Sequence, residues 1–244
     1  MDREVVPVIL AAGRGSRLGM DNIPKPMAIV HGRPFMQEAV SSLFQMGFVS
    51  GEPIAVIGHR GEVIQRYFGC DLTYCSQDIL NGNAGALETA FTTIENLRER
   101  HVLTIQGDDA SQSTIHNLQR MINIHLTRNA DVTILTVNKP DPDAHRKEYL
   151  YDPDGKVVNF RTPIETVDSH GRYTAGIYLF SGAFLEDFFP TLKDETPEGG
   201  ELGIGRLINL ALQQGRSVFH VNSETEYVSV NTPLGLQILR NKEI

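Results

Sequence analysis

The chain has 244 residues, 41% of them hydrophobic and 21% charged, which is typical of a globular protein with a sizeable core. A formal net charge of -8 argues against nonspecific binding to nucleic acid or to anionic membranes. The segment MDREVVPVILAAG has too short an apolar run for a signal peptide, and no later stretch approaches the ~20 apolar residues of a membrane span. We therefore expect a cytoplasmic protein without nucleic-acid or membrane partners.

The first half of the chain alternates between predicted strands and predicted helices. A β-branched apolar run over 5–10 predicts a buried strand, and helical apolar spacing over 35–46 follows a proline. The next expected elements are a strand at 53–58, a helix at 62–68, a strand at 71–75, a helix at 84–97 and a strand at 101–106. Such alternation predicts a mainly parallel sheet covered by helices.

The second half continues the pattern with one interruption. The expected elements are a helix at 113–128, strands at 131–137 and 173–181, a helix at 204–214, and a strand at 226–230 before a terminal helix. The stretch 139–172 is rich in Pro, Asp and Gly, and we interpret it as an insertion at the rim of the ligand cleft, on the acceptor side. Because no repeat or linker is visible, we expect one domain over 1–244.

The cysteines indicate neither a disulfide framework nor a zinc site. Cys70 and Cys75 are the only two, and they have neither CxxC spacing nor a flanking pair of histidines. We expect two free thiols.

The segment 10–19, LAAGRGSRLG, places glycines and arginines directly after the first predicted strand. Backbone N–H groups in such a loop can turn toward an anion, and small residues allow its close approach. Gly13, Gly15 and Gly19 nearly imitate the dinucleotide fingerprint GxGxxG, but the spacing misses by one residue and prolines in 24–26 prevent the helix that should follow. The pattern therefore favours a triphosphate over a dinucleotide.

Two arginines of this loop and one lysine that follows it are candidate phosphate ligands. Arg14, Arg17 and Lys25 can each stabilise phosphate charge, since a charge pair at ~4 Å contributes about 4 kcal/mol at an effective dielectric near 20, before desolvation. For Arg14 alone, a solvated loop charge is an equally good interpretation.

The sequence LAAGRGSRLGMDNIPKPM resembles the signature LAAGxGTRL…PKPM of sugar-phosphate nucleotidyltransferases, with Ser16 at the usual Thr position. The resemblance implies a Rossmann-like nucleotide-diphospho-sugar transferase fold, an α/β structure of three layers around a mixed, mainly parallel sheet. It also implies that Lys25 contacts the α-phosphate and Arg17 the leaving pyrophosphate. The nucleotide-binding residues implied for this loop are Leu10, Ala11, Ala12, Gly13, Arg14, Gly15, Ser16 and Arg17.

A second segment, QDILNGNAGA from Gln77, resembles the family segment Q…GTAGA. A glutamine amide can donate to O4 and accept from N3–H of a pyrimidine, which favours UTP or dTTP. Gly82 and Asn83 complete this expected nucleotide site, although Asn83 replaces the usual Thr. A plain polar residue at a strand end remains the alternative for Gln77.

The run LTIQGDD places carboxylates at the carboxyl end of a predicted strand, where open α/β sheets hold ligands. Gly107 and Asp108 match the family's strand-GD turn, and the resemblance makes Asp108 the first metal ligand and Asn231 the second. Asp109 is interpreted as a residue that supports the metal ligand from behind or forms the turn. One carboxylate and one amide suit Mg²⁺, which takes its other ligands from waters and phosphates. A turn or helix cap before Pro233 is the alternative role for Asn231.

The acceptor side matches the family less well. Thr174 and Gly176 resemble its N-T/A-G segment, and Glu201 its GEL segment. The family's E-K-P reads Arg161-Thr162-Pro163, so the lysine that usually meets the sugar phosphate is absent and Arg161 is its expected substitute. Glu165 and Glu201 are candidate hydroxyl ligands, with a solvated surface role as the alternative.

The resemblance implies that the chain joins a nucleoside triphosphate to a sugar 1-phosphate and releases pyrophosphate. The alternatives are a guanylyltransferase for mannose or heptose 1-phosphate, a cytidylyltransferase for phosphocholine-like acceptors, and a catalytically silent regulatory paralogue. A dinucleotide-binding dehydrogenase is the remaining, weakest alternative. The sequence leaves open whether the chain forms a homo-oligomer.

Overall fold

The structure is a computed structural model of the 244-residue chain. It describes residues 5–15, 23–47, 52–108, 114–138, 148–161, 172–223, 236–237 and 240–241. The expected roles of Ser16, Arg17, Asp109 and Asn231 lie outside the described residues, as do those of Thr162, Glu165 and the strand at 226–230.

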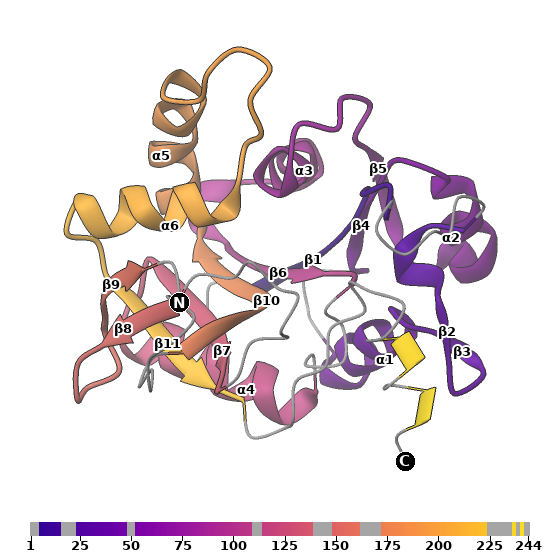
Figure 1. The fold of residues 1–244 in the computed structure, drawn as a ribbon, viewed down its shortest axis with the longest axis horizontal. Coiled ribbons are helices and arrows are strands. Elements are labelled where there is room, and N and C mark those ends of the chain that lie inside the picture. The colour runs from indigo at the N-terminus through magenta and orange to yellow at the C-terminus, as the bar shows by residue number, and fades with distance from the viewer. Residues whose placement is uncertain are drawn as a thin grey trace.

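The core of the molecule is a mixed, mainly parallel sheet (Figure 1). Its main path runs in the order β11-β7-β10-β6-β1-β4-β5, and β10 is antiparallel to both of its neighbours. The strands of this path are β1 (Val5–Ala11), β4 (Ile54–Ile57), β5 (Thr73–Ser76), β6 (His101–Gln106), β7 (Val132–Val137), β10 (Arg172–Ser181) and β11 (Val218–Asn222). The expected α/β fold with a mixed sheet is confirmed.

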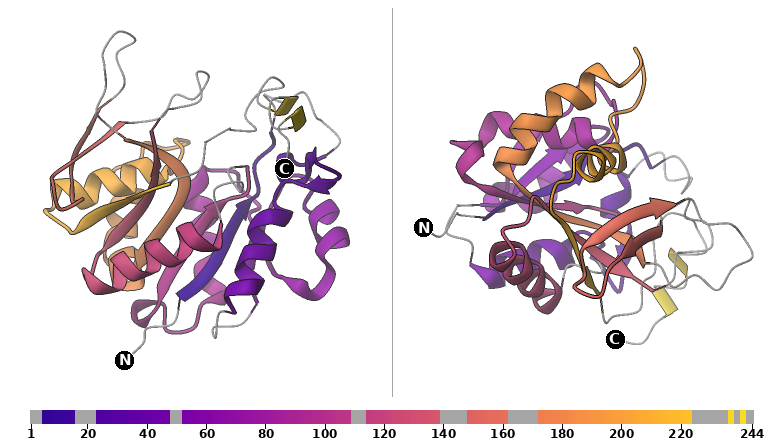
Figure 2. Two further views of the ribbon diagram at one scale, coloured as in Figure 1. Left: turned by 90° about the horizontal axis from the view of Figure 1, so that it is seen from below. Right: turned by 90° about the vertical axis from the view of Figure 1, so that its left-hand side faces the viewer.

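Helices cover both faces of this sheet, which gives three layers (Figure 2, right). On one face lie α1 (Gln37–Met46), α2 (Gly61–Phe68) and α4 (Ile115–Thr127), whose apolar residues join one buried cluster. On the other face lie α3 (Asn83–Ala90), α5 (Gly182–Asp194) and α6 (Ile204–Gln213), which join a second. Alternate side chains of each central strand enter opposite clusters, as the two-residue period of a strand requires.

Several element boundaries differ from the expectations. The helix expected over 84–97 ends at Ala90, and the chain continues as 3-10 turns at Phe91–Thr93 and Leu97–Glu99, interrupted by Asn96 in the left-handed region with φ 52°. Neither α5 nor β11 was expected from the sequence. Helix α5 contains Pro190, and its start is capped by Ser181, whose hydroxyl accepts a hydrogen bond from Phe184 N at 3.2 Å.

The described part of the stretch 139–172 forms a hairpin of β8 (Glu148–Tyr151) and β9 (Val157–Arg161). Strand β8 pairs with β10, and Lys156 bridges to Phe219 of β11, so this hairpin extends the sheet. A second small hairpin, β2 (Ile29–Val30) with β3 (Arg33–Pro34), follows the short 3-10 helix Lys25–Met27.

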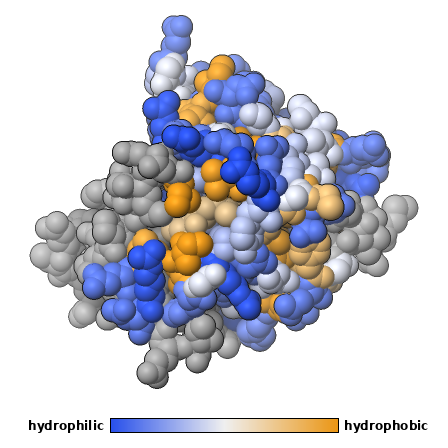
Figure 3. All heavy atoms as spheres, turned by 90° about the vertical axis from the view of Figure 1, so that its right-hand side faces the viewer, coloured by the Kyte–Doolittle hydropathy of each residue, from blue (hydrophilic) through white to orange (hydrophobic). Residues whose placement is uncertain are grey.

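On the face seen in Figure 3, apolar side chains are exposed among hydrophilic ones. Among the described residues, no helix has the length and apolar character that crossing a membrane requires.

Candidate active site

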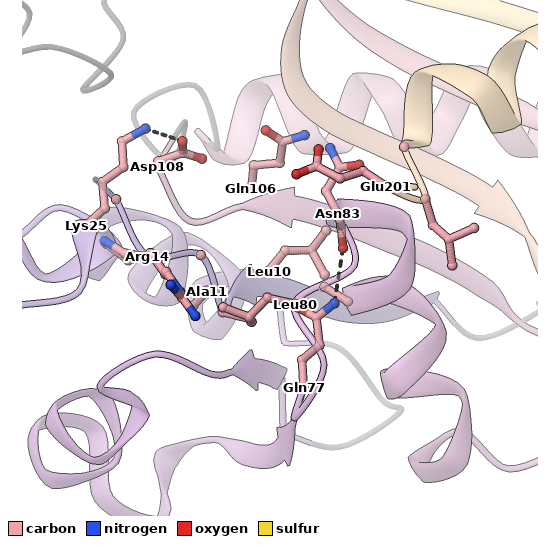
Figure 4. Close-up of a pocket in the computed structure, with 18 residues that line it drawn as sticks. Leu10, Ala11, Arg14, Lys25, Gln77, Leu80, Asn83, Gln106, Asp108 and Glu201 are labelled. Atoms are coloured by element: carbon pink, nitrogen blue, oxygen red, sulfur yellow. Dashed lines mark hydrogen bonds and ion pairs between the residues drawn. The ribbon is translucent and has the colours of Figure 1, made fainter. Parts of the chain in front are cut away.

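A cavity of about 580 Å³ lies at the carboxyl ends of β1 and β6 (Figure 4). It is bounded by the loop after β1, by the segment between β5 and α3, and by the residues that lead into α6. Its lining residues are Leu10, Ala11, Ala12, Gly13, Arg14, Gly15, Lys25, Pro26, Gln77, Leu80, Gly82, Asn83, Ala86, Gln106, Asp108, Glu201, Leu202 and Gly203.

The described part of the loop after β1 requires a glycine at position 15. Gly15 has φ +66°, and a Cβ atom there would lie 2.8 Å from Lys25 Cβ, so only glycine fits without a shift. Ala12 O accepts a hydrogen bond from His59 N at 3.1 Å, which ties the loop to the end of β4. Arg14 is exposed and lines the cavity. The described part of this loop therefore lines the cavity with both backbone atoms and the Arg14 side chain.

Lys25 and Asp108 meet at one end of the cavity (Figure 4). The Lys25 ammonium donates to the Asp108 carboxylate, and the two side chains are 11% and 27% exposed. Gly107 N donates to Leu10 O at 2.9 Å, and a Cβ at Gly107 would press against Pro26 at 3.0 Å. Three segments distant in sequence are thus packed closely enough to fix one cation beside one carboxylate.

The described residues contain no group of three or more His, Cys, Asp and Glu side chains that could hold a metal by themselves. Asp108 nevertheless fits a magnesium site that is completed by substrate. It is partly exposed, it faces the cavity, and it already attracts a cation, the Lys25 ammonium. Mg²⁺ commonly takes one or two carboxylates and fills its remaining positions with water and phosphate oxygens.

Gln77 is 6% exposed and lies at the end of β5. Its Nε2 donates to Asn81 Oδ1 at 2.9 Å and to Gly82 O at 3.2 Å. A primary amide has only two N–H hydrogens, so both are engaged within the protein. The expected donation from Gln77 to a pyrimidine O4 is therefore absent from this conformation, while the expected acceptance from N3–H requires only its Oε1.

One wall of the cavity joins the nucleotide segment to the segment before α6. Ala84 N donates to Leu202 O at 2.9 Å, and Leu202 N donates to Asn81 O at 2.6 Å. Asn83 Oδ1 accepts from Ile204 N at 2.8 Å and so satisfies an N–H group of the first turn of α6. Asn83 thus has a structural function in the loop where the family usually has Thr.

The expected acceptor residues divide into two groups. Glu201 lines the cavity, because the wall just described holds it there. Thr174 and Gly176 are not among the lining residues; they lie in the bulged start of β10, where Thr174 Oγ1 accepts from Gly176 N at 3.0 Å. Because Ile177 pairs with Ile105, this start projects past the end of β6 at the same edge of the sheet. Arg161 is the last residue of β9, and its expected role lies outside the described part of the chain because only its backbone is described.

Several lining residues were not expected from the sequence. Gln106 is the last residue of β6, directly before Gly107 and Asp108, and its position before the turn was an available signal. Leu80 lies within the segment already selected for Gln77. Leu202 lies within the GEL segment already selected for Glu201, but its place in the lining depends on pairing with residues more than a hundred positions earlier in the chain.

The model of the MobA-like NTP transferase domain matches residues 7–151, which is more than half of the chain. The chain belongs to this family. The matched range includes the loop after β1 and also Lys25, Gln77 and Asp108, and it stops before β10.

Curated relatives of this NTP transferase domain extend the similarity beyond residue 151. The bifunctional protein GlmU of Staphylococcus carnosus is 25% identical over 234 residues, which cover 94% of this chain and 50% of GlmU. A D-glycero-alpha-D-manno-heptose 1-phosphate guanylyltransferase of Aneurinibacillus thermoaerophilus is 27% identical over 73% of this chain and 76% of its own. The chain spans about half the length of the GlmU proteins it matches. The resemblance to sugar-phosphate nucleotidyltransferases is thereby confirmed.

Two solved structures share the fold. A UDP-glucose pyrophosphorylase complexed with UDP-glucose has a TM-score of 0.79 at 17% identity, covering 98% of this chain and 97% of its own. A putative glucose-1-phosphate thymidylyltransferase from Bacillus anthracis, in complex with a sucrose, has a TM-score of 0.74 at 23% identity, with the same coverage. At these identities the likeness concerns the fold.

Proposed function

We propose that the chain catalyses nucleotidyl transfer from a nucleoside triphosphate to a sugar 1-phosphate, with release of pyrophosphate. The observation that carries this proposal is the cavity itself. A glycine loop, the cations Arg14 and Lys25, and the carboxylate of Asp108 converge at one end, while the buried amide of Gln77 lines the same space. The cavity can therefore bind the phosphates and the base of one nucleotide at the same time.

In the proposed reaction, a phosphate oxygen of the acceptor attacks the α-phosphorus of the nucleotide. A new phosphorus–oxygen bond forms as the bond to pyrophosphate breaks, and no covalent enzyme intermediate is required. Lys25 stabilises charge on the α-phosphate, and Arg17 is assigned to the leaving pyrophosphate. Asp108 and Asn231 would hold Mg²⁺, which supplies charge stabilisation at the phosphates when bound.

The base is proposed to be uracil or thymine, held through N3–H by Gln77 Oε1. Guanylyl transfer is the second candidate, and a specific observation favours it. Because both Nε2 hydrogens of Gln77 are engaged, the amide offers only an acceptor, and guanine also presents a ring N–H. A curated relative named as a heptose 1-phosphate guanylyltransferase agrees with this alternative.

The acceptor is proposed to lie beside Glu201, whose carboxylate can accept hydrogen bonds from sugar hydroxyls. Gly176 and Thr174 contribute the adjoining edge at the start of β10. Because position 162 is Thr where the family usually has Lys, Arg161 is proposed to contact the sugar phosphate.

The test is pyrophosphate release in the presence of Mg²⁺, crossing UTP, dTTP, GTP and CTP with sugar 1-phosphates and phosphocholine. Release with a single pair identifies base and acceptor together. Lys25→Ala and Asp108→Asn are each expected to lose most of the turnover, about a hundredfold or more, because each removes charge stabilisation at the reacting phosphate. Asn123→Ala, on the exposed side of α4, is the control and should retain wild-type turnover.

Near-normal turnover in either Lys25→Ala or Asp108→Asn, with an unchanged melting temperature, would remove the chemical basis of the proposal. Silence of the wild-type protein across the whole panel, with nucleotide still bound, would instead identify a regulatory paralogue.

A further inference from the structure

The orientation of the Gln77 amide is determined by its hydrogen bond to a backbone carbonyl, a group that can only accept. Gly82 O is a backbone carbonyl, which only accepts hydrogen bonds, so the group of Gln77 at 3.2 Å from it must be Nε2. The same Nε2 donates to Asn81 Oδ1 at 2.9 Å. Gln77 Oε1 is therefore the polar atom of this side chain that remains for a ligand, and Gln77 lines the cavity.

Asn81 can reach Gln77 because residue 85 is glycine. A Cβ atom at Gly85 would lie 1.8 Å from Asn81 Oδ1 and 2.6 Å from its Cγ. The amide of Asn81 thus occupies the space that any other side chain at position 85 would fill. Gly85 lies inside α3, where glycine is unfavourable compared with alanine, so its presence here is explained by this contact.

We propose that Asn81, accommodated by Gly85, is a positioning residue that holds the Gln77 amide with its carbonyl toward the base and so restricts the nucleotide to bases with a ring N–H. Uracil and thymine have N3–H and guanine has N1–H, each of which can donate to Gln77 Oε1. Cytosine N3 and adenine N1 are acceptors, so they form no hydrogen bond with Gln77 Oε1 and are repelled by it. This inference rests on the proposed function and specifies the class of nucleotide that the same site takes.

A site whose buried polar group is left unpaired by the wrong ligand discriminates strongly against it. We therefore expect UTP, dTTP and GTP to bind about tenfold to a hundredfold more tightly than CTP and ATP, the effect of one buried hydrogen bond. In Asn81→Ala, the bond from Gln77 Nε2 to Gly82 O remains, so the preference should fall by about threefold to tenfold rather than vanish.

The experiment measures dissociation constants of the five nucleotides with Mg²⁺ and without acceptor, by calorimetry, for the wild type and matched variants. Asn81→Asp retains an acceptor for Gln77 Nε2 and should keep the wild-type preference. Gly85→Ala forces Asn81 out of place and should reduce the preference as much as Asn81→Ala does. The double variant should equal Asn81→Ala alone, because the two changes remove the same contact.

The control for Gly85→Ala is Gly205→Ala, a change at another helical glycine whose Cβ position has nothing within 4 Å. It should leave nucleotide preference unchanged and raise the melting temperature slightly. A merely structural role for Asn81 would weaken all five nucleotides equally, which overturns the inference. Equal binding of CTP and UTP by the wild type overturns it as well.

Failure of the inference and failure of the proposed function are distinguishable. Pyrophosphate release with an unselective wild-type protein retains the reaction and rejects the role of Asn81. Selective binding that depends on Asn81, without release for any acceptor, retains the role of Asn81 and rejects the reaction.

Discussion

Replacing Gly82 with alanine tests the wall that joins the nucleotide segment to the segment before α6. Gly82 has φ +107° and ψ 174°, a backbone region that is essentially restricted to glycine, and a Cβ atom would lie 2.4 Å from Leu202 O. Both problems involve backbone, so no side-chain movement relieves them. Backbone strain costs about 1–3 kcal/mol. Overpacking adds about 1–3 kcal/mol more.

Since 1 kcal/mol shifts the melting temperature of a chain of this size by about 2–4 °C, Gly82→Ala should lower it by roughly 4–24 °C. Circular dichroism during heating measures this shift, and titration with UTP should show weaker binding as the wall moves. Gly205→Ala is again the matched control. A Gly82→Ala variant that melts within ~2 °C of the wild type and binds UTP equally well would refute the argument that this wall is tightly fitted.

Two further predictions concern parts of the molecule outside the cavity. Burial raises the pKa of the Cys75 thiol to about 11, so at pH 8 only about 0.1% of it is thiolate, and labelling with a thiol reagent should be slow until the pH approaches 11. The exposed Cys70 should label first, which mass spectrometry of the digested protein can resolve; equal rates at pH 8 would contradict the effect of partial burial on Cys75. Ser181→Ala removes the cap of α5 and should cost about 0.5–2 kcal/mol of unfolding free energy in denaturant titrations. Ser181→Asp, which keeps an accepting oxygen, should recover most of that loss.

The local sequence was sufficient for six of the seven strands on the main path of the sheet, all except β11, and for the position of the loop after β1. Val5–Ala11 and His101–Gln106 are fully or largely buried β-branched runs, and such strands carry their signal within a few residues. The glycines and Lys25 are likewise recognisable from their spacing. The expected length of α3 was wrong because apolar spacing continues past Ala90, while the backbone changes there to a 3-10 turn that ends at the extended residue Ile94.

The acceptor side was harder to predict because its residues are placed by contacts between distant segments. Leu202 and Glu201 line the cavity only because backbone hydrogen bonds join them to residues 81–84. These hydrogen bonds depend on how α3 and α6 pack together, so neither segment alone predicts them. Thr174 and Gly176 match a family segment, yet they lie at a bulge in β10 and are not among the lining residues.

The wall also connects the two halves of the proposed reaction. Asn81 contacts Gln77 through its side chain and Leu202 through its carbonyl, so one residue bears on the base and on the acceptor segment together. A change that moves Leu202 should therefore alter nucleotide preference, even though Leu202 is an apolar residue on the acceptor side. If the proposed function holds, base and acceptor specificity are coupled through a shared strip of backbone, and a variant selected for a new acceptor is expected to change its nucleotide preference as well.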